Sequence, residues 1–345
     1  MKFQLSELKK TLLEPDLPET KIAKILSKIS KGFTSERSKI TEYVSDREQV
    51  SAYTLFYLPT NIPKLKFVLD QLSPSLLSDI QNSKILDLGT GPGTFAFAFD
   101  EFFEGEVDVT GVDTSGLMLE QANNINEQIY KNERIKFLPE IPSSFKNETL
   151  FLGHSMNEMG VDKLISLVEK TQPRNLIIIE PGTSEVFIQV VKLRDRMREL
   201  GFNCAFPCAN ITSPCPAKLK RDEGIEDWCH QVLRMSHDDE VERLSQIIKL
   251  DRKAMPLIAH VYTKDQDYKA SSARKVRFLR ETKYSFDWEV CLEVEGTLKH
   301  YTFEIVKKGL KKKEIKALQK TSVGISLEYE VLKELGENHL RVKLI

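Results

Sequence analysis

The clearest pattern of apolar and polar positions lies between residues 84 and 200. Short apolar runs of strand length alternate there with longer amphipathic runs of helical length. Such alternation is typical of a doubly wound α/β domain, in which helices cover a mainly parallel sheet. The pattern predicts strands near 84–88, 107–112, 134–138, 149–154 and 175–180, and helices near 93–104, 115–131, 158–171 and 184–200.

The two flanks of this region have different periodicities. Residues 1–80 place apolar side chains at helical spacing, as in Leu5, Leu8 and Leu12, which predicts an N-terminal helical region. A helix is expected to begin after Ser45 or Asp46, to be interrupted at Pro59-Thr60-Asn61 and to resume over 62–72. Towards the C-terminus the period changes to two, which predicts a small β domain with strands near 256–263, 274–280, 286–294, 298–306 and 339–344.

A glycine-rich turn joins the first predicted strand of the α/β domain to its helix. Glycines stand at Gly89, Gly91 and Gly93, and an acid, Asp113, follows about 20 residues later at the end of the second strand. Glycines let the backbone turn sharply and approach a ligand closely, and the carboxylate of Asp113 can accept hydrogen bonds from two ribose hydroxyls. A dinucleotide fingerprint would need a further glycine at position 94, where the chain has threonine.

The G-x-G-x-G form, with Asp87 two residues before it, resembles motif I of class I S-adenosylmethionine-dependent methyltransferases. The resemblance predicts an S-adenosylmethionine pocket formed by Asp87, Gly89, Gly91, Gly93 and Asp113 in a Rossmann-like domain. A tight strand-to-helix turn without a ligand is the alternative. Ligands in such sheets bind at the carboxyl ends of the strands, so Asn157 and Glu158, after the fourth strand, are expected to contact the cofactor or the substrate.

No catalytic residue follows from the sequence. The chain has no N/D-P-P-Y/F sequence of the kind that holds an exocyclic amine, and no cysteine at a strand end of the sheet to attack a pyrimidine ring. His154 is a candidate general base, although a histidine at a strand end more often satisfies a local hydrogen bond. Methyl transfer can proceed by positioning alone, so an active enzyme and a non-catalytic protein both agree with the sequence.

Composition and charge narrow the class of protein. A hydrophobic content of 41%, 29% charged residues and a net charge of −1 are ordinary for a soluble globular chain, which is expected to be a monomer. No apolar run approaches the roughly 20 residues that span a bilayer, and the N-terminus lacks an apolar signal region, so the cytoplasm or an equivalent reducing compartment is expected. Residues 264–320 hold 15 Lys/Arg against 9 Asp/Glu, which favours an RNA-backbone contact or a solvated helix face.

The five cysteines are unevenly distributed. None occurs in the first 203 residues, four occur between Cys204 and Cys229, and Cys291 follows. Such clustering points to metal or redox chemistry in a reducing compartment. The spacing lacks the second tight cysteine pair of a structural zinc site and suits an iron–sulfur cluster better, while buried free cysteines are the alternative. Cys291 lies on the polar face of a strand whose apolar face holds Trp288 and Val290, so it can reach a second element as a further ligand.

Together these features resemble the methyltransferase-like assembly factors of the small ribosomal subunit, known from mitochondria and with bacterial relatives. The resemblance covers roughly residues 37–310. The motifs that support it are Ala52-Tyr53, Leu58-Pro59-Thr60, LDLGTGPGT at 86–94, Asn157-Glu158, Glu180-Pro181-Gly182, Arg194-Asp195, Pro207-Cys208, Cys215-Pro216, Asp227-Trp228-Cys229-His230 and Arg234.

The resemblance implies a [4Fe–4S] cluster, an S-adenosylmethionine fold and binding to ribosomal RNA of the small subunit. The cysteines that match the family are Cys208, Cys215, Cys229 and Cys291, and Cys204 falls outside the pattern. If the source is eukaryotic, the implied compartment is the organelle matrix. A free-standing small-molecule methyltransferase with a structural zinc is the alternative function.

These observations divide the chain into four expected segments. They are a helical region at 1–80, an S-adenosylmethionine-binding domain at 81–203, a cysteine-rich insertion at 204–254 and a small basic β domain at 255–345. The prolines in the first part of the insertion predict an irregular loop over 201–230.

Overall fold

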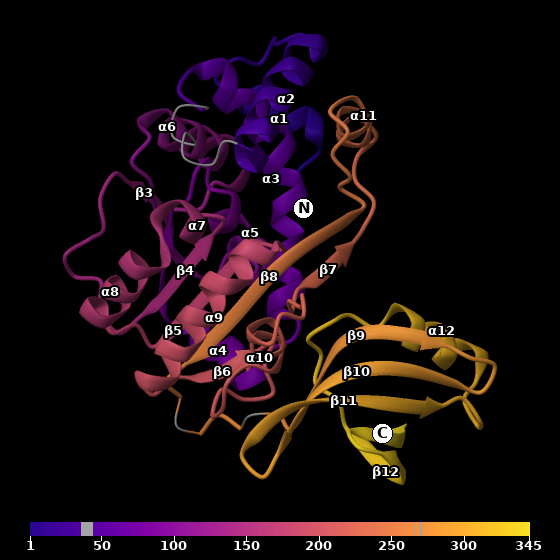
Figure 1. Ribbon diagram of the computed structural model, residues 1–345. Helices are drawn as coiled ribbons and strands as arrows, with labels where there is room; N and C mark the ends of the chain where they lie inside the picture. The colour runs from indigo at the N-terminus through magenta and orange to yellow at the C-terminus, as the bar shows by residue number, and fades with distance from the viewer. Residues whose placement is uncertain (36–43, 266, 270) are drawn as a thin grey trace. The chain divides into compact units, whose positions relative to one another are not determined.

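The computed structural model describes residues 1–35, 44–265, 267–269 and 271–345 (Figure 1). The positions at 36–43, 266 and 270 lie outside the described residues, and 37–43 belong to the stretch on which the family resemblance rests. The chain forms two compact units, and the four segments expected from the sequence stay predictions. Unit 1 comprises Met1–Glu180 and Leu233–Met255, and unit 2 comprises Pro181–Val232 and Pro256–Ile345.

Unit 1 is built on a parallel sheet whose strands run in the order β3-β2-β1-β4-β5. The chain first adds strands on one side of β1 and then on the other, which confirms the predicted doubly wound fold. Most positions of β4 and β5 are buried, because helices cover the sheet. The strands are β1 (Lys84–Leu88), β2 (Asp108–Val112), β3 (Ile135–Leu138), β4 (Thr149–Gly153) and β5 (Asn175–Pro181).

The helices of unit 1 follow the predicted alternation, with one break. Gly160 has a positive φ of 89° and separates two helices where the sequence predicts one. The helices are α1 (Leu5–Thr11), α2 (Glu19–Ser35), α3 (Arg47–Leu69), α4 (Pro74–Asn82), α5 (Thr94–Phe102), α6 (Gly116–Ile125) with a π-helical turn at Asn126–Tyr130, α7 (Met156–Met159), α8 (Val161–Thr171) and α11 (Asp239–Ile247).

The predicted interruption of the third helix at Pro59 is wrong. Helix α3 runs continuously from Arg47 to Leu69, with Pro59 and Pro63 inside it. The hydroxyl of Thr60 donates to the backbone carbonyls one turn earlier, at 3.0 and 3.2 Å. A proline inside a helix costs about 3 kcal/mol, but most of α3 is buried, and burial of its apolar side chains outweighs that cost. Asp46 caps its N-terminus, as expected.

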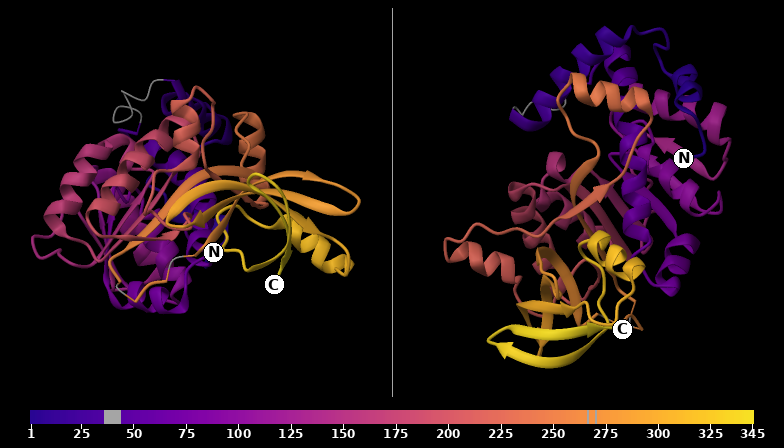
Figure 2. Two further views of the ribbon diagram at one scale, coloured as in Figure 1. Left: turned by 60° about the horizontal axis from the view of Figure 1, so that its bottom comes forward. Right: turned by 90° about the vertical axis from the view of Figure 1, so that its right-hand side faces the viewer.

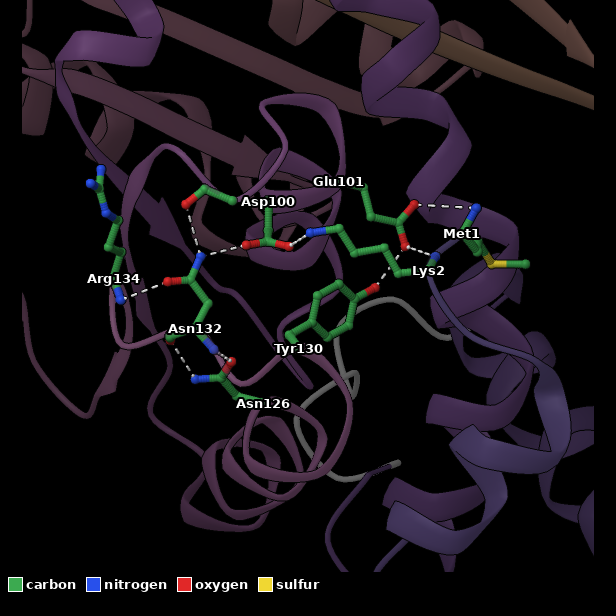
Figure 3. Close-up of polar contacts among 9 residues, drawn as sticks. Met1, Lys2, Asp100, Glu101, Asn126, Tyr130, Asn132 and Arg134 are labelled. Atoms are coloured by element: carbon green, nitrogen blue, oxygen red, sulfur yellow. Dashed lines mark hydrogen bonds and ion pairs between the residues drawn. The ribbon is translucent and has the colours of Figure 1, made fainter.

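The first residues of the chain are attached to the helix that follows the glycine turn (Figure 3). The ammonium of Lys2 contacts Asp100 at 2.5 Å, and the side chain of Asn132 donates to the same carboxylate at 2.6 Å. Tyr130 and the backbone N–H of Lys2 both donate to Glu101. Two segments, the first residues of the chain and the stretch around Tyr130 and Asn132, therefore hold the C-terminal end of α5 in place.

Unit 2 contains an antiparallel pair and a five-stranded sheet. The strand predicted at 256–263 is present as β8 (Ala254–Thr263), and it pairs with β6 (Asn203–Phe206) and not with the five-stranded sheet. The residues of β8 from Leu257 to Thr263 are buried, and a strand of that kind needs cover on both faces. The stretch 201–230 also contains a strand and a helix, where only an irregular loop is predicted. The helices of unit 2 are α9 (Ser184–Glu199), α10 (Pro216–Asp222) and α12 (Lys312–Lys320), and β7 (Gln231–Arg234) crosses the boundary between the units.

The five-stranded sheet has the order β12-β13-β11-β10-β9, with a core around Trp288 and Phe303. Helix α12 packs on this sheet through Ile315 and Leu318 (Figure 2). Four of its strands match the predicted ones closely, whereas β12 is not predicted. The strands are β9 (Ala273–Glu281), β10 (Ser285–Val294), β11 (Thr297–Val306), β12 (Tyr329–Gly336) and β13 (His339–Leu344). None of the described helices combines the length and the apolar character needed to cross a membrane.

Candidate cofactor pocket and cysteine site

The glycine turn lies at the carboxyl end of β1, where β1 has β2 on one side and β4 on the other. Gly89 has a φ of +76°, and a Cβ atom there would lie 2.5 Å from the Cβ of Ser155. A side chain at this position is therefore excluded by both backbone conformation and space. A Cβ on Gly91 would meet no atom within 4 Å, so the turn faces open space at that residue. This is the place where an open α/β sheet binds its ligand.

Asp113 holds the glycine turn from the neighbouring strand. One carboxylate oxygen accepts from the backbone N–H of Gly91 at 2.9 Å, and the other accepts from Ser115 at 2.8 Å. Each carboxylate oxygen has a further lone pair, so Asp113 can still accept hydrogen bonds from a ligand. Gly91 and Asp113, both predicted site residues, therefore lie in direct contact.

Asp87 lies beneath the turn and is fully buried. Its Oδ2 accepts from the hydroxyl of Thr90 at 2.6 Å, and its Oδ1 has no hydrogen-bond partner among the described residues. Burial raises the pKa of this carboxyl to about 7, against the effect of the Thr90 hydrogen bond. The unpaired oxygen marks a polar position that an ammonium or a water molecule could satisfy.

The other predicted contacts, Asn157 and Glu158, lie on the short helix α7 after β4. Glu158 is an exposed residue. Partial desolvation of its carboxyl, followed by the negative charge of the nearby Asp113, raises its pKa to about 7. Glu180, at the end of β5, is buried and accepts from the backbone N–H of Met156 at 2.8 Å. The ends of β1, β2, β4 and β5 thus bring four acids to one edge of the sheet.

Sequence reasoning missed the contribution of helix α3. Because α3 is continuous, Tyr53, Tyr57 and Lys64 fall at helical spacing on one face. The rings of the two tyrosines lie 4.8 Å apart, and burial followed by the charge of Glu158 raises the pKa of Tyr53. The sequence held one indication of this face, which is that Lys64 stands within a strongly apolar helical stretch. The predicted break at Pro59 separated Lys64 from Tyr53 and Tyr57, so the shared face was not recognised.

Lys64 is 3% exposed, and its ammonium lies 3.0 Å from Nε2 of His154. Burial lowers the pKa of both groups, and the positive charge of Arg252 lowers them further. Arg252 itself lies over the ring of Tyr57, 4.9 Å from its centroid. Lys64 is thus a local hydrogen-bonding partner of His154, which agrees with the alternative that this histidine satisfies a local hydrogen bond.

Glu180 should make the stability of the protein depend on pH. Burial raises its pKa to about 8 in the folded chain, so between pH 4.5 and 8 the folded state holds a proton that the unfolded state has released. Stability from this group is therefore lost as pH rises. We expect the free energy of unfolding to fall by about 2 kcal/mol more in the wild type than in Glu180→Gln between pH 6 and pH 8. Urea unfolding at both pH values measures this, with the exposed Glu140→Gln as the control, and equal pH dependence in all three proteins would contradict it.

The second candidate site lies within unit 2. The four predicted ligands, Cys208, Cys215, Cys229 and Cys291, line one cavity, whereas Cys204 does not. They come from four separate places: the residue after Pro207, the cap of α10, the residue just before His230 and the middle of β10. Cys291 lies outside the core cluster that contains Trp288 and Val290, which confirms that it points away from the apolar face.

The four thiols influence one another electrostatically. Burial raises the pKa of Cys229 and Cys291, and the neighbouring thiols add to the effect. Cys208 differs, because the neighbouring Cys204 thiol and the charge of Arg194 lower its pKa although burial opposes them. A thiolate is the form that binds metals, so a metal that binds here would release protons from these thiols.

Two other groups of potential ligands adjoin the cavity. Cys204, Cys208 and His260 place one ligand atom each within 4.8 Å of one another, and Tyr262 is 2.8 Å from His260 Nδ1. Asp227, Glu289 and His300 form the second group. Lys220 and Arg277 already form ion pairs with both of its carboxylates, so this group is neutralised by side chains of the protein.

Residues 47–318 match the profile of the family described as mitochondrial small ribosomal subunit Rsm22. This chain belongs to the Rsm22 family. The match spans the glycine turn, the four cysteines and most of the basic β region of this Rsm22-family chain, and it confirms the resemblance found in the sequence. No curated protein matches the chain.

Solved structures similar to this Rsm22-family chain include methyltransferases of low sequence identity. One is a SAM-dependent methyltransferase from Aquifex aeolicus, with 16% identity, a TM-score of 0.29, and coverage of 42% of this chain and 89% of that one. Another is geranyl diphosphate C-methyltransferase from Streptomyces coelicolor, with 11% identity, a TM-score of 0.36, and coverage of 67% and 87%. Similarity at this level says nothing about what this chain binds.

Proposed function

We propose that this chain is an S-adenosylmethionine-binding protein of the small ribosomal subunit that carries a [4Fe–4S] cluster and contacts ribosomal RNA. The observation that carries the proposal is the convergence of four cysteines from four separate segments on one cavity, in a member of the Rsm22 family. The family description connects that family with the mitochondrial small subunit. The compartment we propose is therefore the organelle matrix.

The cofactor pocket we propose lies over the carboxyl ends of β1 and β2. Bound S-adenosylmethionine would supply an electrophilic methyl group. Gly91 leaves room for the backbone to approach the ligand, and Asp113 accepts from its ribose hydroxyls. In this proposal Asn157 and Glu158, which follow β4, contact the cofactor or the substrate, and His154, which contacts Lys64, is the candidate to accept the proton that a methylated N–H or O–H group would release. On this basis an rRNA methyltransferase activity is part of the proposal.

The cluster we propose is held by Cys208, Cys215, Cys229 and Cys291. Four thiolates are the donor set that a [4Fe–4S] cluster takes. The residues present fit this group in two ways, since all four thiols line one cavity and the cavity also contains buried arginine side chains. When bound, the cluster would supply a one-electron redox centre, or a rigid link between the four segments that hold it.

The RNA contact we propose is the outer face of α12. Ile315 and Leu318 face the sheet, while Lys312, Lys313 and Lys316 are exposed. Among the described residues no carboxylate forms an ion pair with these three lysines. A row of unneutralised lysines suits the phosphate backbone and makes binding dependent on salt.

Sedimentation of cell extract through a sucrose gradient tests the ribosomal part of the proposal. The wild-type chain is expected to co-migrate with the small subunit, and the variant with Lys312→Glu and Lys313→Glu is expected to shift towards free protein at moderate salt. A matched control carries Lys163→Glu and Lys170→Glu on the exposed face of α8. A wild-type protein that stays at the top of the gradient in extract containing intact subunits would refute the proposal.

A free-standing small-molecule methyltransferase with a structural zinc is the second candidate. The close grouping of Cys204, Cys208 and His260 is the observation that favours it. Metal analysis of anaerobically purified protein separates the two. About four irons per chain with visible absorbance support the cluster, whereas one tightly bound zinc in a colourless protein supports the alternative.

A further inference from the structure

Two arginines are buried against the cysteine cavity. Arg194, on α9, is 1% exposed, and Arg274, on β9, is 4% exposed. Both line the same cavity as the four cysteines. Arginine is rarely buried so deeply unless its charge is balanced.

The described carboxylates balance the charge of these arginines only in part, through the partly exposed Asp195 beside Arg194. Arg194 donates to the carbonyl of Ser213 at 2.6 Å and to the half-exposed Asp195 at 2.8 Å. Arg274 donates to the carbonyls of Gly324 and Ala205, at 3.1 and 2.8 Å. Within the described part of the chain no carboxylate forms an ion pair with Arg274, and the Nε of each arginine has no hydrogen-bond partner.

A buried cation whose partners are mainly neutral carbonyls costs free energy unless an anion lies beside it. The groups beside this pair are thiols, and Arg194 is close enough to Cys208 and Cys215 for their charges to interact. Four thiolates around a cluster core of charge two plus give a net charge of minus two, and reduction adds one more negative charge. The cavity therefore pairs two buried cations with the site of a doubly negative group.

We propose that Arg194 and Arg274 are the counter-charges of the cluster and set its reduction potential. This inference rests on the proposed cluster. A nearby positive charge stabilises the reduced form more than the oxidised form, because the reduced form carries more negative charge. Loss of either arginine makes the cluster harder to reduce and easier to lose by oxidation. Arg194 and Arg274 act through their positive charge and do not bind the iron atoms.

Redox titration of the anaerobically purified holoprotein, followed by the electron paramagnetic resonance signal of the reduced cluster, tests the proposal. Arg194→Gln and Arg274→Gln keep a donor for the neighbouring carbonyls but remove the charge. Each is expected to shift the one-electron reduction equilibrium at least tenfold towards the oxidised form, which lowers the potential by about 59 mV. Arg194→Lys should stay close to the wild type. Arg196→Met, on the exposed side of the same helix, should leave the potential unchanged.

The outcomes separate this inference from the proposed function. A wild-type protein without iron refutes the cluster itself. If both glutamine variants hold a cluster with the same reduction potential as the wild type, the role of the arginines is refuted. If the glutamine variants fold but lose their iron, the lysine variants decide: iron retained in Arg194→Lys and Arg274→Lys supports a requirement for charge, and iron lost there shows a role in packing only.

Discussion

Replacing Cys291 by serine is expected to remove the iron and the visible absorbance of the anaerobically purified protein. Cys291 is the only one of the four cavity cysteines that comes from the five-stranded sheet, and no other cysteine of that sheet can replace it. A serine oxygen is a poor ligand for iron in a cluster, since these sites are built from thiolates. We expect iron content to fall from about four per chain to less than one.

The matched control for this experiment is Cys204→Ser. Cys204 lies in β6, is 1% exposed and does not line the cavity, so its replacement should leave the iron content near that of the wild type. Circular dichroism of both variants shows whether the fold is kept. If Cys291→Ser keeps its full iron content while Cys204→Ser loses it, the four-cysteine assignment is wrong and the set of Cys204, Cys208 and His260 takes its place.

Replacing Asp113 by asparagine is expected to weaken the binding of S-adenosylmethionine by about 10- to 150-fold. A hydrogen bond to a charged group contributes roughly 1.5–3 kcal/mol, and each 1.4 kcal/mol is a factor of ten in affinity. Asp113 also accepts from Gly91, so the variant loosens the turn that the cofactor approaches. Isothermal titration calorimetry with S-adenosylmethionine and S-adenosylhomocysteine measures the change.

Asp108→Asn is the control for that measurement. Asp108 starts the same strand, β2, but is exposed and lies at the amino end, away from the glycine turn. Its replacement should leave the affinity unchanged. If wild-type protein with an intact fold releases no heat with either ligand, the cofactor pocket is refuted, whereas equal affinity in wild type and Asp113→Asn refutes only the role of Asp113.

The local unit around the glycine turn could be predicted almost completely from the sequence. The strand, turn, helix and second strand are adjacent in the chain, and each has its own signal: an apolar run, glycines, an amphipathic run and an acid. The orientation of Cys291 could also be predicted, because side chains alternate strictly along a strand. Such features depend on neighbours within a few residues, which the sequence displays directly.

Features that depend on distant partners could not be predicted in this way. Helix α3 passes through Pro59 because burial against helices far away in the chain outweighs the local cost of proline. Strand β8 pairs with β6 and not with the sheet that follows it in sequence. No local pattern in the sequence contains the burial or the pairing that decides either case.

The sequence alone determined the doubly wound fold, the glycine turn with Asp113, and the four cysteines that its family resemblance singles out. Only the tertiary structure decided what surrounds them: Lys64 beside His154, the buried Glu180, and Arg194 and Arg274 at the cysteine cavity. The physical reason is the range of the interactions. Periodicity and turn chemistry act within a few residues, whereas burial of a charge depends on side chains that the fold brings together from distant parts of the chain.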